Sequence, residues 1–225
     1  MIIFVDDDGA ACRLWIKAAA GAAGHACQFK DDARKRAACD YFRANPHRLH
    51  LGVIGFDFEA IRPGTVASDI RDIHQNLNMW DGIISSHFSL DGQRYQVQTV
   101  CSPDRDMMSA SVVYKPSFSG EMKPHAPILL RLPYPTGEHV DDACDWKSID
   151  KHTSGIIHQG NQYAVVRHII DDCTYYITIR WSGKASFTEK AKHQFTLVPE
   201  TNSINFSAEF TQTEPSAANL SEAKA

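Results

Sequence analysis

Apolar and polar residues alternate with a period of two along most of the chain beyond residue 45. Successive side chains of a β-strand point to opposite faces, so this alternation predicts strands with one buried face. Eight or more short strands, with turn signals and no helical pattern between them, predict a mainly β fold, an antiparallel β-sandwich. The expected strands lie within 49–58, 82–90, 95–99, 108–114, 128–132, 163–169, 175–181, 195–197 and 204–210.

Turn residues separate these segments. Asp91-Gly92 lies between two alternating segments and is the strongest hairpin signal, because a type I′ turn needs a positive φ at both central positions. Ser102-Pro103-Asp104-Arg105-Asp106 and Asp171-Asp172 predict two further turns. The chain from 82 to 114 is therefore expected to form a hairpin followed by a third antiparallel strand.

The first 44 residues follow a different pattern. Met1–Val5 is apolar and fits a short buried strand, whereas 10–26 is rich in alanine and 30–43 is rich in charge, and both are helix-like. Asn45-Pro46 ends this pattern, because the residue before a proline is disfavoured in the α region. We expect a helical or irregular lead-in at 1–44, a β-sandwich domain at 45–210 and a polar, disordered tail at 211–225.

Composition argues against some classes of function but does not point to a particular one. The 225 residues are 43% hydrophobic and carry a formal net charge of −4, so no basic face for nucleic acid or an anionic membrane is expected. No apolar run approaches the ~20 residues of a membrane span. The apolar start is too short for a signal peptide, which makes the cytoplasm the default location and free thiols the default for the six cysteines.

Several groups of residues suggest chemistry. No pair of cysteines has C-x-x-C spacing, and no histidine spacing matches a zinc signature, so no metal or cofactor is expected and structural or surface roles are favoured. No G-x-S-x-G motif marks a serine nucleophile. Three groups of histidines and acids could suggest a metal site: His47 and His50, His139 with Asp141 and Asp142, and His152 near Asp145 and Asp150.

Two enzymatic or signalling alternatives stay open at this point. A small glycosidase would use loop acids such as Asp141, Asp142 and Asp145, although a catalytic pair must flank the bond at roughly 5–10 Å. A response-regulator receiver would use the acidic cluster at 6–8 with Asp57 as phosphoacceptor. A receiver needs helices alternating with parallel strands, however, and the predicted hairpin at 82–114 argues against it.

Aromatic residues offer flat faces that suit the C–H side of a sugar ring. Trp181 ends an alternating strand and is expected in the core. Trp80 and Trp146 lie in more polar surroundings, where exposure is more common, but buried packing is still the favoured interpretation for each.

Nine short motifs occur in a recognisable order over about three quarters of the chain. They are NPHRLHLG at 45–52, IHQNLNMWDG at 73–82, SHFSLDG at 86–92, TVCSPDRD at 99–106, LPYP at 132–135, DW at 145–146, HT at 152–153, YY at 175–176 and RWSG at 180–183. With these motifs, the segment 45–210 resembles the N-terminal, supersandwich-like β-domain of six-hairpin, (α/α)6-barrel glycoside hydrolases.

The resemblance implies a function. In such enzymes the β-domain packs on the barrel, and the catalytic acids sit mainly on the barrel, so no catalytic residue can be carried over here. The resemblance implies a non-catalytic, carbohydrate-associated domain of a glycoside-hydrolase-like protein, truncated before its barrel. Carbohydrate and a separately encoded catalytic barrel are the expected partners, and the candidate sugar-binding residues are Trp80, His87, Trp146 and His152.

Overall fold

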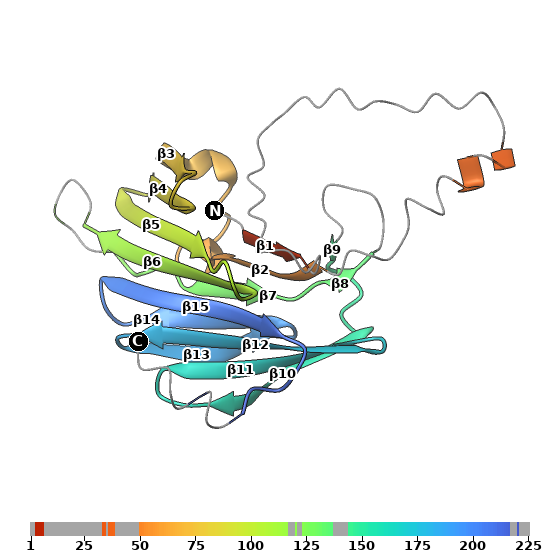
Figure 1. The fold of residues 1–225 in the computed structure, drawn as a ribbon. Coiled ribbons are helices and arrows are strands. Elements are labelled where there is room, and N and C mark those ends of the chain that lie inside the picture. Colours follow the sequence, from red (N-terminus) through yellow and green to blue (C-terminus); the bar gives the residue numbers. More distant parts are fainter. Residues whose placement is uncertain are drawn as a thin grey trace.

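The protein is a sandwich of two antiparallel β-sheets, seen in a computed structural model (Figure 1). The structure describes residues 3–6, 33–34, 36–38, 50–116, 120, 123–136, 144–216 and 220. Strands dominate the described part, which confirms the mainly β, antiparallel fold. The receiver hypothesis is wrong, because a receiver needs a parallel sheet with helices between its strands.

The larger sheet has eight strands in the order β10-β11-β12-β15-β6-β5-β4-β3, and the smaller has five in the order β1-β2-β7-β14-β13. A two-stranded ribbon, β8 with β9, forms a separate small sheet, and Tyr134 of β8 packs against the core. The bounds are β1 Ile3–Asp6, β2 His50–Phe56, β3 Ile70–Asn78, β4 Ile83–Leu90, β5 Gln93–Cys101, β6 Met107–Lys115, β7 Ile128–Arg131, β8 Tyr134–Pro135, β9 Cys144–Asp145, β10 His152–Gln159, β11 Tyr163–Ile170, β12 Cys173–Ser182, β13 Ala185–Ala191, β14 Gln194–Pro199 and β15 Ser203–Thr211, with short 3-10 helices η1 Phe58–Ala60 and η2 Ala67–Asp69.

The hydrophobic core lies between the two sheets, and on strands such as β4, β5, β6 and β15 it is built largely from every second residue. On β5, for example, Val97 and Thr99 are buried while Gln98 between them is exposed. Phe195 and Leu197 of β14 supply the opposite wall. Each such apolar side chain stabilises the fold by about 1.5–3 kcal/mol on burial, which is why the period-two pattern was visible in the sequence.

The turn between β4 and β5 has the predicted geometry. Asp91 and Gly92 have φ values of 51° and 81°, and Leu90 pairs directly with Gln93. A two-residue loop with positive φ at both positions fits the right-handed twist of the flanking strands, and only glycine adopts such a φ without steric cost.

Described residues outside 45–210 contact the sandwich at both of its ends. Strand β1 pairs with β2, so the sandwich includes residues that precede position 45. Residues 212–216 run from the end of β15 toward β10 (Figure 1), where Glu214 forms an ion pair with His158 at 2.8 Å. Leu220 is only 9% exposed.

The receiver's proposed phosphoacceptor has a structural position. Asp57 follows β2, is only 4% exposed, and its Oδ2 lies 2.5 Å from Nζ of Lys190. A buried carboxylate already paired with a lysine is not presented to a phosphoryl donor. No helix within the described residues is both long and apolar enough to cross a membrane.

Candidate functional site

The outer face of the eight-stranded sheet, opposite the core, carries small and amide side chains in register. Six residues from six neighbouring strands are directly opposite one another in successive pairs, and we call them the polar row. None of them is charged. The polar row consists of Asn76 on β3, Ser85 on β4, Gln98 on β5, Ser111 on β6, Asn205 on β15 and Ser182 on β12.

The middle of this face is hollowed into an open groove of about 960 Å³. Four members of the polar row line it, from Gln98 to Ser182. A second row lies beside them, in which Val100 pairs with Ser109 and Ser109 with Ser207. The serines on β6 and β15 are shorter than the side chains around them, and this difference in length creates the hollow.

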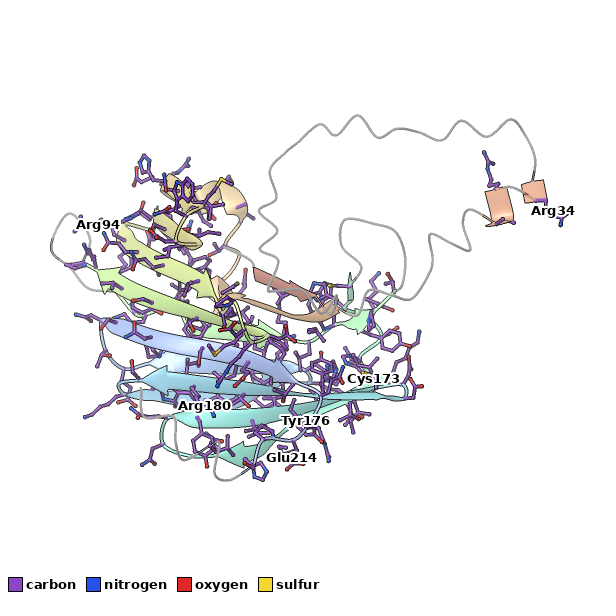
Figure 2. All side chains as sticks on the ribbon, in the orientation of Figure 1. Arg34, Arg94, Cys173, Tyr176, Arg180 and Glu214 are labelled. Carbon is purple, nitrogen blue, oxygen red and sulfur yellow. The ribbon has the colours of Figure 1, made fainter. Side chains whose placement is uncertain are left out.

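Charged groups line the groove beside the second row. Glu209 on β15 lies between two arginines, with Oε1 3.6 Å from Nη1 of Arg105 and Oε2 3.8 Å from Nη1 of Arg180. Figure 2 shows Arg180 and Tyr176 at different positions along β12. Because both ion pairs exceed hydrogen-bond distance, the guanidinium N–H groups are not held in a tight bidentate pair. The groove thus offers donors, acceptors and one excess positive charge.

The structure separates the four predicted sugar-binding residues into two groups. Trp80 is 98% exposed in the β3–β4 turn, and His87 is exposed on the outer face of β4. Trp146 is half-buried, with the guanidinium of Arg131 4.6 Å from its ring centroid, and His152 is buried on β10.

Strands β4 and β10 are six strand spacings apart, about 29 Å at 4.8 Å per spacing, and His152 faces the core rather than the outer face. The four residues therefore do not form one site, and a sugar-binding role for each stays a prediction. Trp80 and His87 both lie close in the chain to Ile83 of β4, which lines the groove.

A second polar constellation is buried between the sheets. His152, His168 and His193 bring one ring nitrogen each within 4.8 Å of one another. The rings of His152 and His193 are stacked, with centroids 3.6 Å apart. Only His152 stands out in the sequence, because the separations of 16 and 25 residues between the three histidines match no known metal-binding signature.

One hydrogen-bond chain connects the two sheets. The hydroxyl of Tyr175 donates to the carbonyl of Leu51 on β2 at 2.7 Å, so it accepts from Nδ1 of His168 at 2.6 Å. Nε2 of His168 is then unprotonated and accepts from Nδ1 of His152, also at 2.6 Å. The chain fixes the neutral tautomer of each ring.

His193 is held separately, in the turn between β13 and β14. Its Nε2 donates to the carbonyl of Ile149 at 2.8 Å, and its Nδ1 accepts from the hydroxyl of Ser154 at 2.7 Å. Both ring nitrogens are therefore engaged, and the turn of the smaller sheet is tied to β10 of the larger one.

These histidines do not fit a metal ion in this arrangement. Two nitrogens bound to one tetrahedral zinc ion, each at about 2.0–2.1 Å, lie roughly 3.4 Å apart, whereas Nδ1 of His152 and Nε2 of His168 are 2.6 Å apart. The stacked rings of His152 and His193 also direct their lone pairs alongside each other rather than to one point. The cluster is a hydrogen-bonded connection between the sheets.

The environment keeps the cluster neutral. Burial, reinforced by the neighbouring histidines, lowers the pKa of His168 to about 3. Burial, reinforced by the neighbouring His193 and Lys192, lowers the pKa of His152 to about 4, and Asp145 opposes this. Protonation of His168 at Nε2 would remove the acceptor for Nδ1–H of His152. Protonation of His152 would add a donor that the hydrogen-bond chain cannot accommodate.

The fold should therefore lose stability in mild acid. In the unfolded chain these histidines titrate near pH 6.5, so below that pH the unfolded state binds more protons than the folded state. The contribution of the neutral pair is complete above pH 6.5 and is lost as the pH falls toward 4 and then 3. The expected slope is about 1.4 kcal/mol per pH unit for each histidine.

Urea denaturation at pH 6.5, 5.75 and 5.0 measures this effect, in a range above the usual pKa of most carboxylates. The variant His168→Gln should reduce the slope relative to the wild type. A wild-type stability that is constant over this range would contradict the neutral, buried state of the pair.

Comparison with known proteins gives a match in fold only. No family model matches the sequence, and no curated protein matches it. The fold is similar to that of a solved chain described as "Putative kojibiose phosphorylase from human microbiome", with a TM-score of 0.40 and 10% identity. The match covers 77% of this chain and 24% of that one, so this chain spans about a quarter of that protein's length.

Proposed function

We propose that this domain binds carbohydrate in the groove on the outer face of its eight-stranded sheet and does not itself catalyse hydrolysis. The observation that carries the proposal is the groove itself, about 960 Å³ in volume. Its lining combines amides, serines and a charged triad of Arg105, Glu209 and Arg180 with apolar residues such as Val100 and Met107. A volume of this order is typical of ligand sites.

The chemistry of the lining suits sugar hydroxyls. A hydroxyl both donates and accepts, and so do the amides of Gln98 and Asn205 and the hydroxyls of the serines. The guanidinium groups donate only, and Glu209 accepts only. Because the groove is open, bound sugar keeps part of its hydration, and the proposal therefore implies weak binding rather than deep, tight capture.

We propose no catalytic role because the described lining of the groove holds a single carboxylate. Hydrolysis of a glycosidic bond normally uses two carboxyl groups that flank it. Among the described residues that line the groove, Glu209 is the one carboxylate, and it lies between two arginines.

The loop acids do not support the alternative of a small glycosidase. The side chain of Ser148 and the backbone N–H groups of Lys147 and Ser148 donate hydrogen bonds to the carboxylate of Asp145. These bonds hold the carboxyl's pKa below its usual value, which suits a turn rather than a general acid. Asp141 and Asp142 lie outside the described residues. The predicted catalytic-barrel partner stays a prediction.

Binding to a panel of soluble oligosaccharides, measured by affinity electrophoresis and then by calorimetry, tests the proposed function. Gln98→Ala and Asn205→Ala should each weaken binding about three- to tenfold, because each removes one or two hydrogen bonds. Gln96→Ala is the matched control, since Gln96 lies on the same strand and the same face outside the groove. Equal loss in all three variants, or in none, would refute the assignment of the groove.

A further inference from the structure

We infer that the ligand of the groove is a neutral, linear oligosaccharide that lies across the strands along the polar row, with its end stacked on Trp80. This inference rests on the proposed function and adds to it the class of glycan, its direction and a further contact. Three features of the outer face support it: the regular register of the row, its lack of charge and the position of the exposed tryptophan.

The register gives the direction. Adjacent strands are about 4.8 Å apart, so polar side chains recur at that interval along the row, over roughly 24 Å from Asn76 on β3 to Ser182 on β12. One pyranose unit of a linear glycan is about as long as one strand spacing. Each successive sugar of a chain lying across the strands therefore meets a new amide or hydroxyl.

The alternative direction, along a strand, is less suitable. Outward-facing residues of one strand recur about every 6.6 Å and differ in chemistry from one to the next. On β6 the serines at 109 and 111 are flanked by Met107 on one side and by Val113 and Lys115 on the other. A glycan lying along β6 would meet apolar and cationic side chains within a few residues.

The row also indicates a neutral ligand. Its six members are all asparagine, glutamine or serine. The charged groups of the groove lie beside the row, where Glu209 already accompanies Arg105 and Arg180. A ligand held on the row therefore meets neutral amides and hydroxyls, which match the hydroxyl groups of an uncharged sugar.

Trp80 lies beside the β3 end of the row, in the turn that follows the last paired residues, Asn78 and Ile83. It occupies the turn that joins β3 and β4, the two strands that contribute Asn76 and Ser85. Its backbone N–H donates to Oδ1 of Asn78 at 3.1 Å, and Nδ2 of Asn78 donates to Asp81 at 2.5 Å, so the turn is held in place. The indole is 98% exposed and gains favourable contact when an apolar sugar face covers it.

The opposite end of the sheet is covered. Val165 and Thr178 point to the outer side of β11 and β12, yet they are 0% and 1% exposed. The chain after β15 reaches β10 at the Glu214–His158 ion pair, and Figure 2 shows Glu214 below β12. The free length of the outer face therefore extends from the groove toward β3 and Trp80.

A length series tests the inference. We would titrate the protein with cello- and malto-oligosaccharides of one to six units by calorimetry. Affinity should rise with each added unit up to five or six units. Trp80→Ala should weaken binding of the longest chain about three- to tenfold and leave the shortest bound chain unchanged. Trp146→Ala removes a tryptophan that does not line the groove, and it should change the affinity for neither the longest nor the shortest chain.

The outcomes separate the two proposals. Binding that is equally strong for one unit and for six, or full affinity of the longest chain for Trp80→Ala, overturns the arrangement across the strands and leaves carbohydrate binding intact. Failure of every sugar, including those of the wider panel, overturns the proposed function and this inference with it. Asn76→Ala provides a second check, because it should affect long chains only.

Discussion

Replacing His168 by alanine is expected to lower the free energy of unfolding by about 3–5 kcal/mol. The side chain is 0% exposed, so its loss leaves a cavity between the sheets. It also leaves Nδ1–H of His152 without its acceptor and the hydroxyl of Tyr175 without its donor. Urea denaturation followed by tryptophan fluorescence at pH 7 measures the change.

Two further variants define this prediction. Tyr175→Phe removes only the hydroxyl and should cost about 1–2 kcal/mol, which keeps the network testable even where His168→Ala does not fold. His87→Ala, on the exposed outer face, should cost less than about 0.5 kcal/mol. A loss below 1 kcal/mol in His168→Ala would show that the buried chain does not hold the sheets together.

Filling the groove should abolish carbohydrate binding without unfolding the protein. Ser207 lies in the second row, directly between Ser109 and Arg180, and its side chain points to the outer face. Ser207→Trp would place an indole in the hollow and is expected to weaken binding at least tenfold. Because the side chain is outward-facing, the melting temperature should change by no more than about 3 °C.

Ser203→Trp is the matched control, because Ser203 lies on the same strand and the same face but does not line the groove. It should bind with wild-type affinity. Calorimetry with one oligosaccharide from the panel compares both variants with the wild type. Unchanged binding in Ser207→Trp, at wild-type stability, would place the sugar elsewhere.

Much of the fold was predictable because burial leaves a local signature. Tyr95 and Val97 alternate with polar residues, and Asp91-Gly92 marks the turn, so a few consecutive residues suffice. Strands β3 and β13 were not predicted, because most of their residues are exposed and carry no apolar alternation. Local pattern cannot reveal a strand that has no buried face.

The candidate site was not predictable, because it depends on pairing between distant segments. Asn205 meets Ser111 only because β15 lies between β12 and β6, and these residues are far apart in the sequence. Serines and amides at alternate positions look like an ordinary solvated face until the register is known. For Trp80, which is 98% exposed, the sequence analysis favoured buried packing, and nothing in the sequence pointed to the groove.

The histidine network was missed for the same reason. His152 was proposed as a sugar contact, but pairing of β10 with β11 turns it toward the core beside His168. His193 joins them from the turn between β13 and β14, in the other sheet. Convergence across a sandwich cannot be read from sequence spacing.

The location of the bound glycan tests the central claim most directly. Backbone amide signals of the ¹⁵N-labelled protein, recorded by NMR during titration with an oligosaccharide from the panel, report which residues it contacts. We predict shifts centred on Gln98, Ser111 and Asn205, with the amides around Trp146 and His152 unchanged. Shifts centred on Trp146 and His152, or no shifts at millimolar glycan, would contradict a carbohydrate-binding groove on the outer face.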